Sequence, residues 1–529
     1  MSTHAVELAG ITGHLITVEA YLSGRLPATI LIGLPDNRVR ETRDRVRAAM
    51  VNSRLGWPDR KITVGLTPAS LPKHGSGHDL AIAVAILAAW GQAPHSPAPS
   101  PGADAPRPMT VPPGTVFLAE LGLDGRLRPV RGVLPAVVAA AREGFDLIVV
   151  ATANRDEAAL VEGIRVIAAD WLADVAAWLR GEPEPVAAVS NVSAGTVTLA
   201  TEREKDLAEV LGCPGARRAL EISATGGHHL ALFGPDPGKT MLAERLPGIM
   251  PRLDQAAALE ATAVHSIAGE LSPGARLIER PPVAAPHHTA TIPIMMGGGS
   301  NGSIRPGAVS LAHRGTLLLD QAPQFRREVL HALRQPFEAG EVIIARHATV
   351  TRFPARFTLV LTADTCPCGS ADGHCECSPA IRRRYLGRLP GQLLDRVDLK
   401  VTMPRPTRSR MQLDARVADS SAVVAERVAA ARDRAAARLA GTPWRTNAEI
   451  PGVEFRRSFA LQPAALTVVE EALSAGQLSS AGANGVIRVA WTLADLAGRA
   501  RPTAEEVIES LALRPGEPGD DITVDRPGI

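Results

Sequence analysis

The chain has 529 residues, which is long for one hydrophobic core, so we expect two or three domains. Apolar side chains make up 45% of it, yet no apolar run reaches the roughly 20 residues that a membrane-spanning helix requires, which excludes a helical membrane protein. The 57 basic and 55 acidic side chains leave a net charge of +2, which excludes a basic surface overall but not a local channel for nucleic acid. The start, MSTHAVELAGITGH, lacks the features of a signal peptide, so we expect a cytoplasmic protein with no membrane partner.

The first 180 residues alternate short apolar strands with helical stretches. TILIGL and KITVGL are predicted strands on either side of a predicted helix, and similar patterns continue through 115–152. A segment dense in Pro, Ala and Gly at about 91–114 is predicted to be an exposed insertion, because Pro disrupts the interior of helices and strands. A second segment of this kind, 181–202, is predicted to be a linker.

Residues 203–405 have the order of elements typical of a parallel α/β nucleotide-binding fold. Helices are predicted over 203–212 and 216–227, followed by the strand HLALFG, a loop and the helix KTMLAERL, and then by the strands TLLLD and FTLVLTAD. Residues 406–515 are rich in Ala and Arg and are predicted to form a helical domain, and the remaining tail, 516–529, is predicted to be flexible.

The loop between HLALFG and KTMLAERL is similar to a phosphate-binding loop but is one residue short. The pattern needs Gly, four residues and then Gly-Lys-Ser/Thr, whereas three residues separate Gly234 from Gly238. In such a loop the backbone N–H groups bind phosphate oxygens, Lys239 would contact the outer phosphates of a nucleoside triphosphate and Thr240 would bind Mg²⁺. An apolar strand follows at the expected distance and ends in Asp320, a second candidate to hold Mg²⁺. The alternative is an ordinary Gly-Pro turn.

Motifs along nearly the whole chain resemble the YifB/ComM family of magnesium-chelatase-like AAA+ ATPases. In chain order they are GLPDNRVRETRDRVRAAMVNS, ARRALEISATGGHHLALFGP, GKTMLAERLPGIMP, RPPVAAPHHTA, GGGSNGSIRPGAVSLAHRGTLLLD, LRQPFEAGEV, TCPCG, LPGQLLDRVDL and IRVAWTLADLAG. The resemblance implies an α/β protein with a ribosomal-S5-like, Lon-protease-like α+β domain over 1–180, an AAA+ P-loop domain over 203–405 and a helical lid over 406–515. It also implies ATP and Mg²⁺ as cofactors, DNA as a partner in branch migration during recombination or transformation, and a homo-oligomeric ring, namely a hexamer.

Three places depart from that family's pattern. The loop lacks a residue and contains Asp236, whose carboxylate would repel polyphosphate. Asp320 is followed by Gln321, where the family has a glutamate that activates the attacking water, and an amide cannot act as a general base. The next strand ends in Asp364, where the family has an asparagine beside the γ-phosphate. Because the apolar scaffold motifs are intact, we hypothesise a folded protein in which triphosphate binding is weakened and hydrolysis is slow or absent.

Four further residues match positions of the family. Arg396 in LPGQLLDRVDL matches the arginine that contacts a neighbouring subunit's γ-phosphate and stabilises charge in the transition state. Arg488 in GVIRVAWTLADLAG matches the sensor arginine of the lid. The alternatives are an ion pair within the domain for Arg396 and a solvated helix face for Arg488. His287 and His288 in APHHTA are expected to be buried structural histidines.

Two segments within residues 1–180 resemble those that hold the serine and the lysine of Lon proteases. The serine position corresponds to Gly77, with Ser76 one residue earlier, and the lysine position corresponds to Leu134. A Ser–Lys pair requires a desolvated lysine, whereas Lys73 is predicted to be a surface charge. We therefore expect no peptidase activity, and either a role in recruitment or ring assembly or a purely structural one.

The cysteines are concentrated in one segment, CPCGSADGHCEC, which contains Cys366, Cys368, Cys375 and Cys377. Four thiolates can bind one tetrahedral Zn²⁺ and thereby close a loop that has few apolar residues of its own. The C-x-C spacing is tighter than the usual C-x₂-C, and His374 could replace one thiolate. The alternatives are reduced loop cysteines or two strained disulfides under oxidation.

Nucleic-acid contacts have two candidate regions in the sequence. Arg305 lies in the glycine-rich segment GGGSNGSIRPG, which could line a central pore, and IRRRYLGRLP contains a basic cluster made of Arg382, Arg383, Arg384 and Arg388. Such side chains would contact phosphates and give salt-dependent, sequence-independent binding. The alternative for the cluster is an inter-subunit or solvated face.

Two main function classes follow from these observations. One is a ring ATPase that remodels DNA, and the other is a non-hydrolysing scaffold or regulatory partner of an active paralogue. A third reading, an ATPase subunit for metal insertion into a tetrapyrrole, is disfavoured by the Lon-like N-terminal segments, which belong to the YifB/ComM arrangement.

Overall fold

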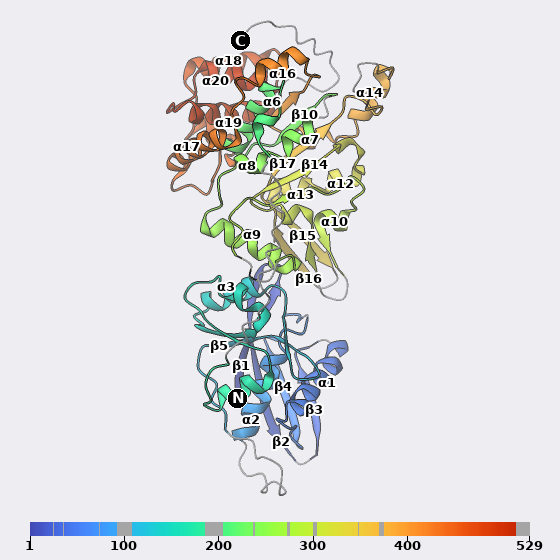
Figure 1. Cartoon of the computed structure of the whole chain (residues 1–529), viewed down its shortest axis with the longest axis vertical. Helices are drawn as coiled ribbons and strands as arrows, with labels where there is room; N and C mark the ends of the chain where they lie inside the picture. Colours follow the sequence, from blue (N-terminus) through green and yellow to red (C-terminus); the bar gives the residue numbers. More distant parts are fainter. Residues whose placement is uncertain are drawn as a thin grey trace.

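The computed structural model describes residues 1–24, 26–34, 36–73, 75–92, 108–185, 205–235, 238–271, 274, 276–299, 304–346, 349–369 and 375–514. The molecule is elongated, with an N-terminal sheet at one end, a second sheet in the middle and a helical C-terminal region at the other end (Figure 1). Most of the expected proline-rich insertion and of the expected linker, and the expected tail, lie outside the described residues. The expected domain boundaries stay a prediction.

The N-terminal part is built on a mixed sheet. Within the described ranges its strand order is β3 (Ala28–Ile32), β4 (Lys61–Thr67), β2 (Thr12–Ser23), β1 (Ser2–Ala9), β5 (Thr115–Leu118), β8 (Leu147–Ala151) and β9 (Arg165–Ala169). β2 is antiparallel to both β1 and β4, whereas the other neighbours are parallel. A small ribbon, β6 (Glu120–Leu121) with β7 (Leu127–Arg128), lies beside it.

Both faces of this sheet are covered by helices, because its inner strands carry apolar side chains on alternate faces. Phe117 packs into one core and its neighbours Val116 and Leu118 into the other. The first face is covered by α1 (Asp36–Asn52), α2 (Asp79–Gln92) and α5 (Leu172–Leu179). The second is covered by α3 (Val133–Arg142) and α4 (Arg155–Ala158), which follows the 3₁₀ turn η1 (Thr152–Asn154).

The central sheet is parallel throughout. Within the described ranges its strand order is β11 (Val283–Ala284), β14 (Thr316–Leu319), β17 (Thr358–Ala363), β10 (Leu230–Phe233) and β18 (Leu399–Thr402). The chain enters at β10, adds β11, β14 and β17 on one side and finally adds β18 on the other. The order in which strands are added therefore reverses at β10. In open parallel sheets, ligands bind beside such a reversal, at the carboxyl ends of the strands.

Two apolar cores lie against the two faces of the central sheet. Leu230 and Leu232 face one core, and Ala231 and Phe233 face the other. The connecting helices are η2 (Leu207–Glu209), α6 (Pro214–Gly226), α7 (Gly238–Ala243), α8 (Leu246–Ile249), α9 (Gln255–Ala268), α10 (Ile292–Met296), α11 (Ala308–Leu311), η3 (Ala322–Gln324), α12 (Arg327–Ala332), α13 (Arg334–Ala339), α14 (Pro379–Leu386) and α15 (Gly391–Asp395). Two antiparallel ribbons project from this part, β12 (Gly297–Gly298) with β13 (Arg305–Pro306), and β15 (Glu341–Arg346) with β16 (Thr349–Pro354).

The C-terminal part is helical. Its elements are α16 (Arg408–Asp414), α17 (Ser421–Leu439), η4 (Asn447–Glu449), η5 (Gly452–Arg456), α18 (Pro463–Ser474), α19 (Ser480–Leu496) and α20 (Ala504–Ala512). α17 and α19 pack on α6, and α19 is buried along most of its length. A capping box between Thr503 and Glu506 begins α20.

The N-terminal and central parts meet where α3 packs against α9 (Figure 1). The Glu157 carboxylate accepts hydrogen bonds from the backbone N–H of Leu134, 2.9 Å away, and from the Ser266 hydroxyl. A second contact brings the turn between β1 and β2 against β16, where a β-carbon on Gly10 would collide with the Arg352 carbonyl oxygen. The junction therefore combines packing with a shared carboxylate.

The sequence predictions for the elements hold in most places and are wrong in one. The predicted strands TILIGL, KITVGL, HLALFG, TLLLD and FTLVLTAD correspond to β3, β4, β10, β14 and β17. The helix predicted over 203–212 is wrong, because its described residues form only the 3₁₀ turn η2 and a loop. The Asp206 carboxylate caps that turn, and Gly212, at φ 84°, ends the segment in a conformation that breaks a helix.

None of the helices in the described ranges combines the length and the apolar character needed to cross a lipid bilayer.

Candidate nucleotide-binding site

The loop after β10 lies at the carboxyl edge of the central sheet, where a bound phosphate would be expected. Gly234 has φ 131° and its N–H donates to the Ala363 carbonyl at 3.2 Å. A β-carbon here would collide with the Met403 carbonyl oxygen, so the position requires glycine. Helix α7 begins at Gly238, one residue before the predicted helix KTMLAERL, and ends at Ala243. Asp236 lies outside the described residues.

Thr240 and Asp320, both predicted to hold Mg²⁺, lie together at this edge. The Thr240 hydroxyl donates to Asp320 Oδ1 at 2.9 Å, and the Thr362 hydroxyl donates to the same oxygen at 2.6 Å. A hydroxyl and a carboxylate side by side are the hard oxygen donors that Mg²⁺ binds, so these residues fit the ion. Thr362 was missed in the sequence, because nothing in an apolar strand marks which of its residues will orient a carboxylate on the neighbouring strand.

Lys239 is nearly buried, with 5% of its surface exposed. Its Nζ donates to the Gly234 carbonyl at 2.6 Å and forms an ion pair with Asp364 Oδ1 at 2.9 Å. Asp364 directly follows β17, the strand next to β10, so its carboxylate faces the loop. The lysine predicted to bind the outer phosphates is thus neutralised by an acidic side chain of the same chain.

Gln321 lies at the same edge, directly after Asp320. Its backbone is in the left-handed region, with φ 51° and ψ 49°, and its N–H donates to the Thr362 hydroxyl at 2.9 Å. Such a backbone costs a residue with a β-carbon about 1 kcal/mol or more and is common at functional sites. The position that the family fills with a glutamate is therefore held in place here but carries an amide.

Arg396 and Arg488 lie at the opposite, amino edge of the sheet. Both line one open cavity of about 1030 Å³, together with His229 and Glu338. His229 precedes β10 and the phosphate loop follows it, so the two sites are separated by the length of a four-residue strand, roughly 13 Å. The structure therefore does not bring either arginine to this chain's own loop.

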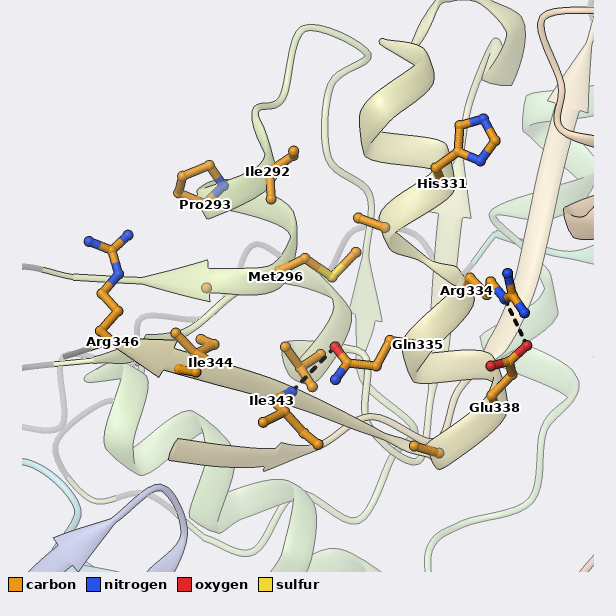
Figure 2. A pocket seen from close by; sticks show the side chains of 15 residues that line it. Ile292, Pro293, Met296, His331, Arg334, Gln335, Glu338, Ile343, Ile344 and Arg346 are labelled. Carbon is orange, nitrogen blue, oxygen red and sulfur yellow. Dashed lines mark hydrogen bonds and ion pairs between the residues drawn. The ribbon is translucent and has the colours of Figure 1, made fainter. Parts of the chain in front are cut away.

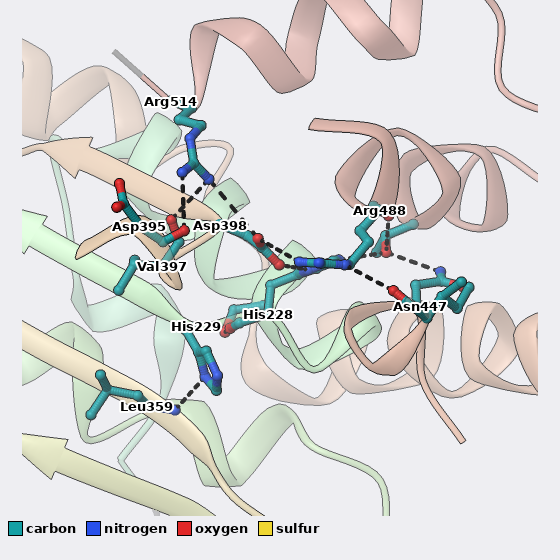
Figure 3. Close-up of polar contacts among 12 residues, drawn as sticks. His228, His229, Leu359, Asp395, Val397, Asp398, Asn447, Arg488 and Arg514 are labelled. Carbon is teal, nitrogen blue, oxygen red and sulfur yellow. Dashed lines mark hydrogen bonds and ion pairs between the residues drawn. The ribbon is translucent and has the colours of Figure 1, made fainter. Parts of the chain in front are cut away.

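Arg488 is held in a polar network at this amino edge (Figure 3). Its guanidinium donates to Asp398 Oδ1 at 3.1 Å and to the Ile450 carbonyl at 3.2 Å. His228 Nδ1 is hydrogen-bonded to Asp398 Oδ2 at 2.9 Å. Burial opposes ionisation of Asp398, but Arg488 and His228 outweigh it and keep the pKa of this carboxyl well below its usual range. This network joins β18 to α19, and the helix face at Arg488 is not the solvated one given as its alternative.

Arg396 is more loosely held. Its side chain is 51% exposed, and its guanidinium lies 3.5 Å from Glu338 Oε1, a long contact between exposed groups. An exposed pair of this kind contributes about 0–1 kcal/mol to stability. Arg396 is consequently free to exchange Glu338 for another anionic partner.

The Cys366, Cys368, Cys375 and Cys377 side chains converge at the end of β17. Their four Sγ atoms all lie within 4.8 Å of one another. Cys366 is buried, and its Sγ is 2.9 Å from that of Cys368 and 3.1 Å from that of Cys375. His374, considered as an alternative ligand, lies outside the described residues.

In the N-terminal part the prediction for Lys73 is wrong. Lys73 is buried, with 1% of its surface exposed, and its Nζ donates to the carbonyls of Pro68 and Leu71 at 2.6 and 3.0 Å. The carbonyls replace water around the ammonium, which is why a charged residue can leave the surface here. The Ser76 hydroxyl donates to Glu120, and Leu134 is fully buried in α3.

The prediction for the two adjacent histidines is also wrong. His287 is exposed and His288 is half-buried, and their rings stack with centroids 4.0 Å apart. His287 Nδ1 is hydrogen-bonded to the Thr289 hydroxyl at 2.9 Å. Both lie in a loop after β11 rather than in a core, because the segment APHHTA has too few apolar residues to be covered.

Comparison with known families finds three matching models. One described as "Magnesium chelatase, subunit ChlI" matches residues 206–411, one described as "Subunit ChlI of Mg-chelatase" matches 18–154, and one described as "Magnesium chelatase, subunit ChlI C-terminal" matches 418–514. Together they extend over the N-terminal, central and C-terminal parts of the structure.

Similar proteins match over almost their full length. An uncharacterized protein of Mycobacterium tuberculosis is 46% identical over 515 residues, which is 96% of this chain and 97% of that protein. The competence protein ComM of Haemophilus influenzae is 38% identical over 508 residues, 96% of this chain and 95% of ComM. The YifB protein of Escherichia coli is 36% identical over 518 residues, 97% of this chain and 96% of YifB. The chain therefore belongs to the YifB/ComM family of magnesium-chelatase-like proteins, and its parallel sheet and helical C-terminal region fit an AAA+-like magnesium-chelatase fold.

Proposed function

We propose that this chain binds ATP with Mg²⁺ at the carboxyl edge of its central sheet and hydrolyses it slowly or not at all. The observation that carries the proposal is the pairing of Lys239 with Asp364 at 2.9 Å, next to a strand end where Gln321 replaces a carboxylate. Triphosphate must compete with Asp364 for the lysine. Binding also leaves that carboxylate facing the terminal phosphate, which is unfavourable for two like charges.

The chemistry of the pocket separates binding from cleavage. Gly234, Gly238 and Lys239 would hold the phosphates, and Thr240 with Asp320 would hold Mg²⁺, which neutralises phosphate charge when bound. Gln321 can orient a water by accepting or donating a hydrogen bond, but it cannot remove the proton from that water. The named residues for binding are thus present in a loop that is one residue short, while the expected base is missing.

Turnover measurements test this proposal. The purified chain is compared with Gln321→Glu and, as a matched control, with Gln321→Leu. Because general-base catalysis contributes about 10²–10⁴-fold, we expect Gln321→Glu to raise steady-state ATP turnover by roughly 10²-fold and Gln321→Leu to leave it at the low native level. Brisk turnover in the native chain that Asp364→Asn abolishes would overturn the proposal and identify Asp364 as the base.

We further propose that the chain assembles as a homo-oligomeric ring, as a hexamer. Arg396 and Arg488 line an open cavity at the edge of the sheet away from this chain's own loop. In a ring, that edge of one subunit can face the loop of the next, so the arginines could act on a neighbour's nucleotide. Light scattering with and without ATP tests the assembly. A monomer under all nucleotide conditions would contradict it.

DNA is the partner that the arginine arrangement favours. Gly298 in β12 pairs with Arg305 in β13, and the Arg346 guanidinium lies beside the same glycine (Figure 2). Both arginines are exposed, and within the described residues neither forms an ion pair. Two unpaired guanidinium groups on neighbouring ribbons suit a phosphate backbone. A role in DNA remodelling is consistent with the name of the competence protein ComM, one of the similar proteins.

Salt-dependent binding to a fluorescent DNA oligonucleotide tests the DNA contact. Arg305→Ala with Arg346→Ala should weaken binding and reduce the slope of log affinity against log salt by about 1 to 2. Arg352→Ala is the matched control, because Arg352 lies on the same β15–β16 hairpin as Arg346 but is paired with Glu341. Equal losses in the double variant and in the control would remove this support for DNA remodelling and leave the non-hydrolysing scaffold as the better reading.

A further inference from the structure

The four clustered cysteines have the geometry of a closed metal site. Their Sγ atoms lie within 4.8 Å of one another, and three of the pairs are 2.9, 3.1 and 3.5 Å apart. A disulfide requires about 2.05 Å, so these sulfurs are not joined in pairs. Four sulfurs around one tetrahedral Zn²⁺ at about 2.3 Å from the metal would be roughly 3.8 Å apart, a value between the shortest separation here, 2.9 Å, and the 4.8 Å within which all four lie.

We propose that Cys366, Cys368, Cys375 and Cys377 bind one structural Zn²⁺ as thiolates. Soft thiolate ligands in a tetrahedral set favour zinc or iron over magnesium, calcium or manganese. All four positions of the tetrahedron are filled by protein, so the ion has no open position for a substrate and acts by holding the chain. The site is separate from the proposed Mg²⁺ site, whose donors are oxygen atoms.

The ion would fix the connection between β17 and α14. Cys366 lies two residues after Asp364, at the end of β17, and Cys377 directly precedes Ser378, which caps α14. Arg382 of α14 donates to the Cys375 carbonyl at 3.4 Å. Apart from buried Cys366, the cysteines of this connection are exposed or half-buried, so apolar packing contributes little to its order. Metal binding is then the main source of local stability.

The consequence of this clamp is the position of a basic helix. α14 stands away from the body of the central part (Figure 1) and carries the exposed side chains of Arg382, Arg383 and Arg384. At the other end of the connection, Asp364 faces Lys239. The zinc would therefore hold a cationic surface at a fixed place relative to the nucleotide pocket.

Metal analysis of the full chain tests the site. Protein is purified in reducing buffer without chelator, and its metal content is measured by mass spectrometry. We expect one zinc per chain in the native protein and in Cys213→Ser, whose cysteine is buried elsewhere, and little or none in Cys366→Ser with Cys375→Ser. Titration with a mercurial reagent should release the zinc as about four thiols react. Iron in place of zinc, no metal, or zinc retained in the double variant would overturn the proposal.

Limited trypsin digestion tests the clamp without relying on a variant that might misfold. The native chain is treated with a strong chelator and then resupplied with ZnCl₂. Cleavage after Arg382, Arg383 and Arg384 should become roughly tenfold faster on zinc removal, because local opening becomes easier by about 1.4 kcal/mol, and should slow again on resupply. Cleavage that is unaffected by chelator in protein shown to have lost its zinc would overturn the structural role.

Discussion

The two edges of the central sheet differ in how far each keeps the groups to which the family resemblance assigns a role with ATP. At the carboxyl edge, the loop is short, Gln321 stands where a carboxylate is expected, and Lys239 is paired with Asp364. At the amino edge, Arg396 and Arg488 are both present, exposed or partly exposed, and line one cavity. The first edge would serve this chain's own nucleotide, and the second would serve a neighbour's.

If the chain hydrolyses ATP slowly, as proposed, this difference would let it assist hydrolysis on a neighbour better than it performs hydrolysis itself. The departures from the family's pattern lie at the carboxyl edge, whereas at the amino edge Arg488 is held in a polar network with Asp398 and His228. The same pattern is also compatible with the second function class derived from the sequence, a non-hydrolysing scaffold or regulatory partner of an active paralogue.

The largest effect is expected from removing Arg396 in a chain whose own pocket has been restored. The restored variant carries Gln321→Glu and Asp364→Asn. An arginine that reaches the γ-phosphate of a neighbour contributes about 10³–10⁵-fold to turnover, so adding Arg396→Ala should lower the restored rate by about 10³-fold. Steady-state ATP turnover is the measurement, and Arg43→Ala, an exposed arginine in α1, is the control.

Mixing experiments then separate action on a neighbour from action within one chain. Native chain, which has a weak pocket but an intact Arg396, should rescue the restored Arg396→Ala variant, whereas native chain carrying Arg396→Ala should not. Rescue by both chains, or no loss of turnover in the first place, would show that the amino edge takes no part in catalysis.

The next largest effect is expected for stability when Arg488 is removed. Arg488→Met keeps the apolar contacts of the side chain but leaves the buried Asp398 without its nearest cation, at 3.1 Å. Breaking a buried pair costs about 3–5 kcal/mol; because His228 still contacts Asp398 and Arg488 is partly exposed, we expect a loss of about 2–3 kcal/mol in the free energy of unfolding. Urea unfolding measures it, with Arg488→Lys as the control that retains the charge. An unchanged unfolding midpoint for Arg488→Met would mean that the network adds nothing to the fold.

A smaller effect concerns the pH dependence of the amino edge. Burial lowers the pKa of His229 to about 4, and its Nδ1 accepts a hydrogen bond from the Leu359 N–H at 3.0 Å. The unfolded chain has an ordinary histidine with a pKa of 6.5, so between pH 6.5 and 4 it binds more protons than the native chain, and the free energy of unfolding falls as the pH is lowered. His229→Asn keeps the acceptor but does not titrate.

Urea unfolding of both proteins at several pH values isolates this contribution. The native chain should lose about 2 kcal/mol more than His229→Asn across the window. His78, whose pKa burial also lowers to about 4, is present in both proteins, so its contribution cancels. Identical pH profiles would mean that His229 is not kept neutral in the fold.

The smallest effect is expected from Asp364→Asn alone, which tests whether Asp364 weakens nucleotide binding at the carboxyl edge of the sheet. The change frees Lys239 from its ion pair and replaces a negative charge beside the terminal phosphate with a neutral amide. We expect the Kd for a fluorescent ATP analogue with Mg²⁺ to fall about tenfold, which corresponds to about 1.4 kcal/mol. Asp320→Asn, at the proposed Mg²⁺ site, should change the Kd in the opposite direction. Weaker binding by Asp364→Asn would show that this carboxylate assists the nucleotide.

The sequence predicted the frame of the site because that frame depends on local patterns. Apolar runs marked β10, β14 and β17, and the Gly-Lys-Thr segment marked the start of α7. The prediction of a helix over 203–212 was wrong. The apolar spacing of this segment is compatible with a helix, but Asp206 caps a 3₁₀ turn and Gly212 adopts a conformation that ends the segment. The prediction that Lys73 lies at the surface was wrong because a local sequence pattern does not show where backbone carbonyls point inward and accept hydrogen bonds from an ammonium group.

The contacts within the site could not be predicted, because they join residues that are distant in the chain. Lys239 and Asp364 are brought together only by the pairing of β10 with β17. The place of Arg488 depends on how α19 packs on α6, and a match to a family position does not tell at which edge of the sheet the residue lies. A zinc site was one of the alternatives that the sequence left open for the cysteines. Their convergence depends on how the described residues after β17 and before α14 lie in space, which the sequence does not tell.

The carboxylate of Glu157 has a mechanical consequence. It receives one hydrogen bond from the first turn of α3 and another from Ser266 in α9, so a single side chain of α4 ties the N-terminal part to a helix of the central part. A change in the tilt of α9 would therefore be transmitted through this carboxylate to α3, and the N-terminal part would change its orientation relative to the central part.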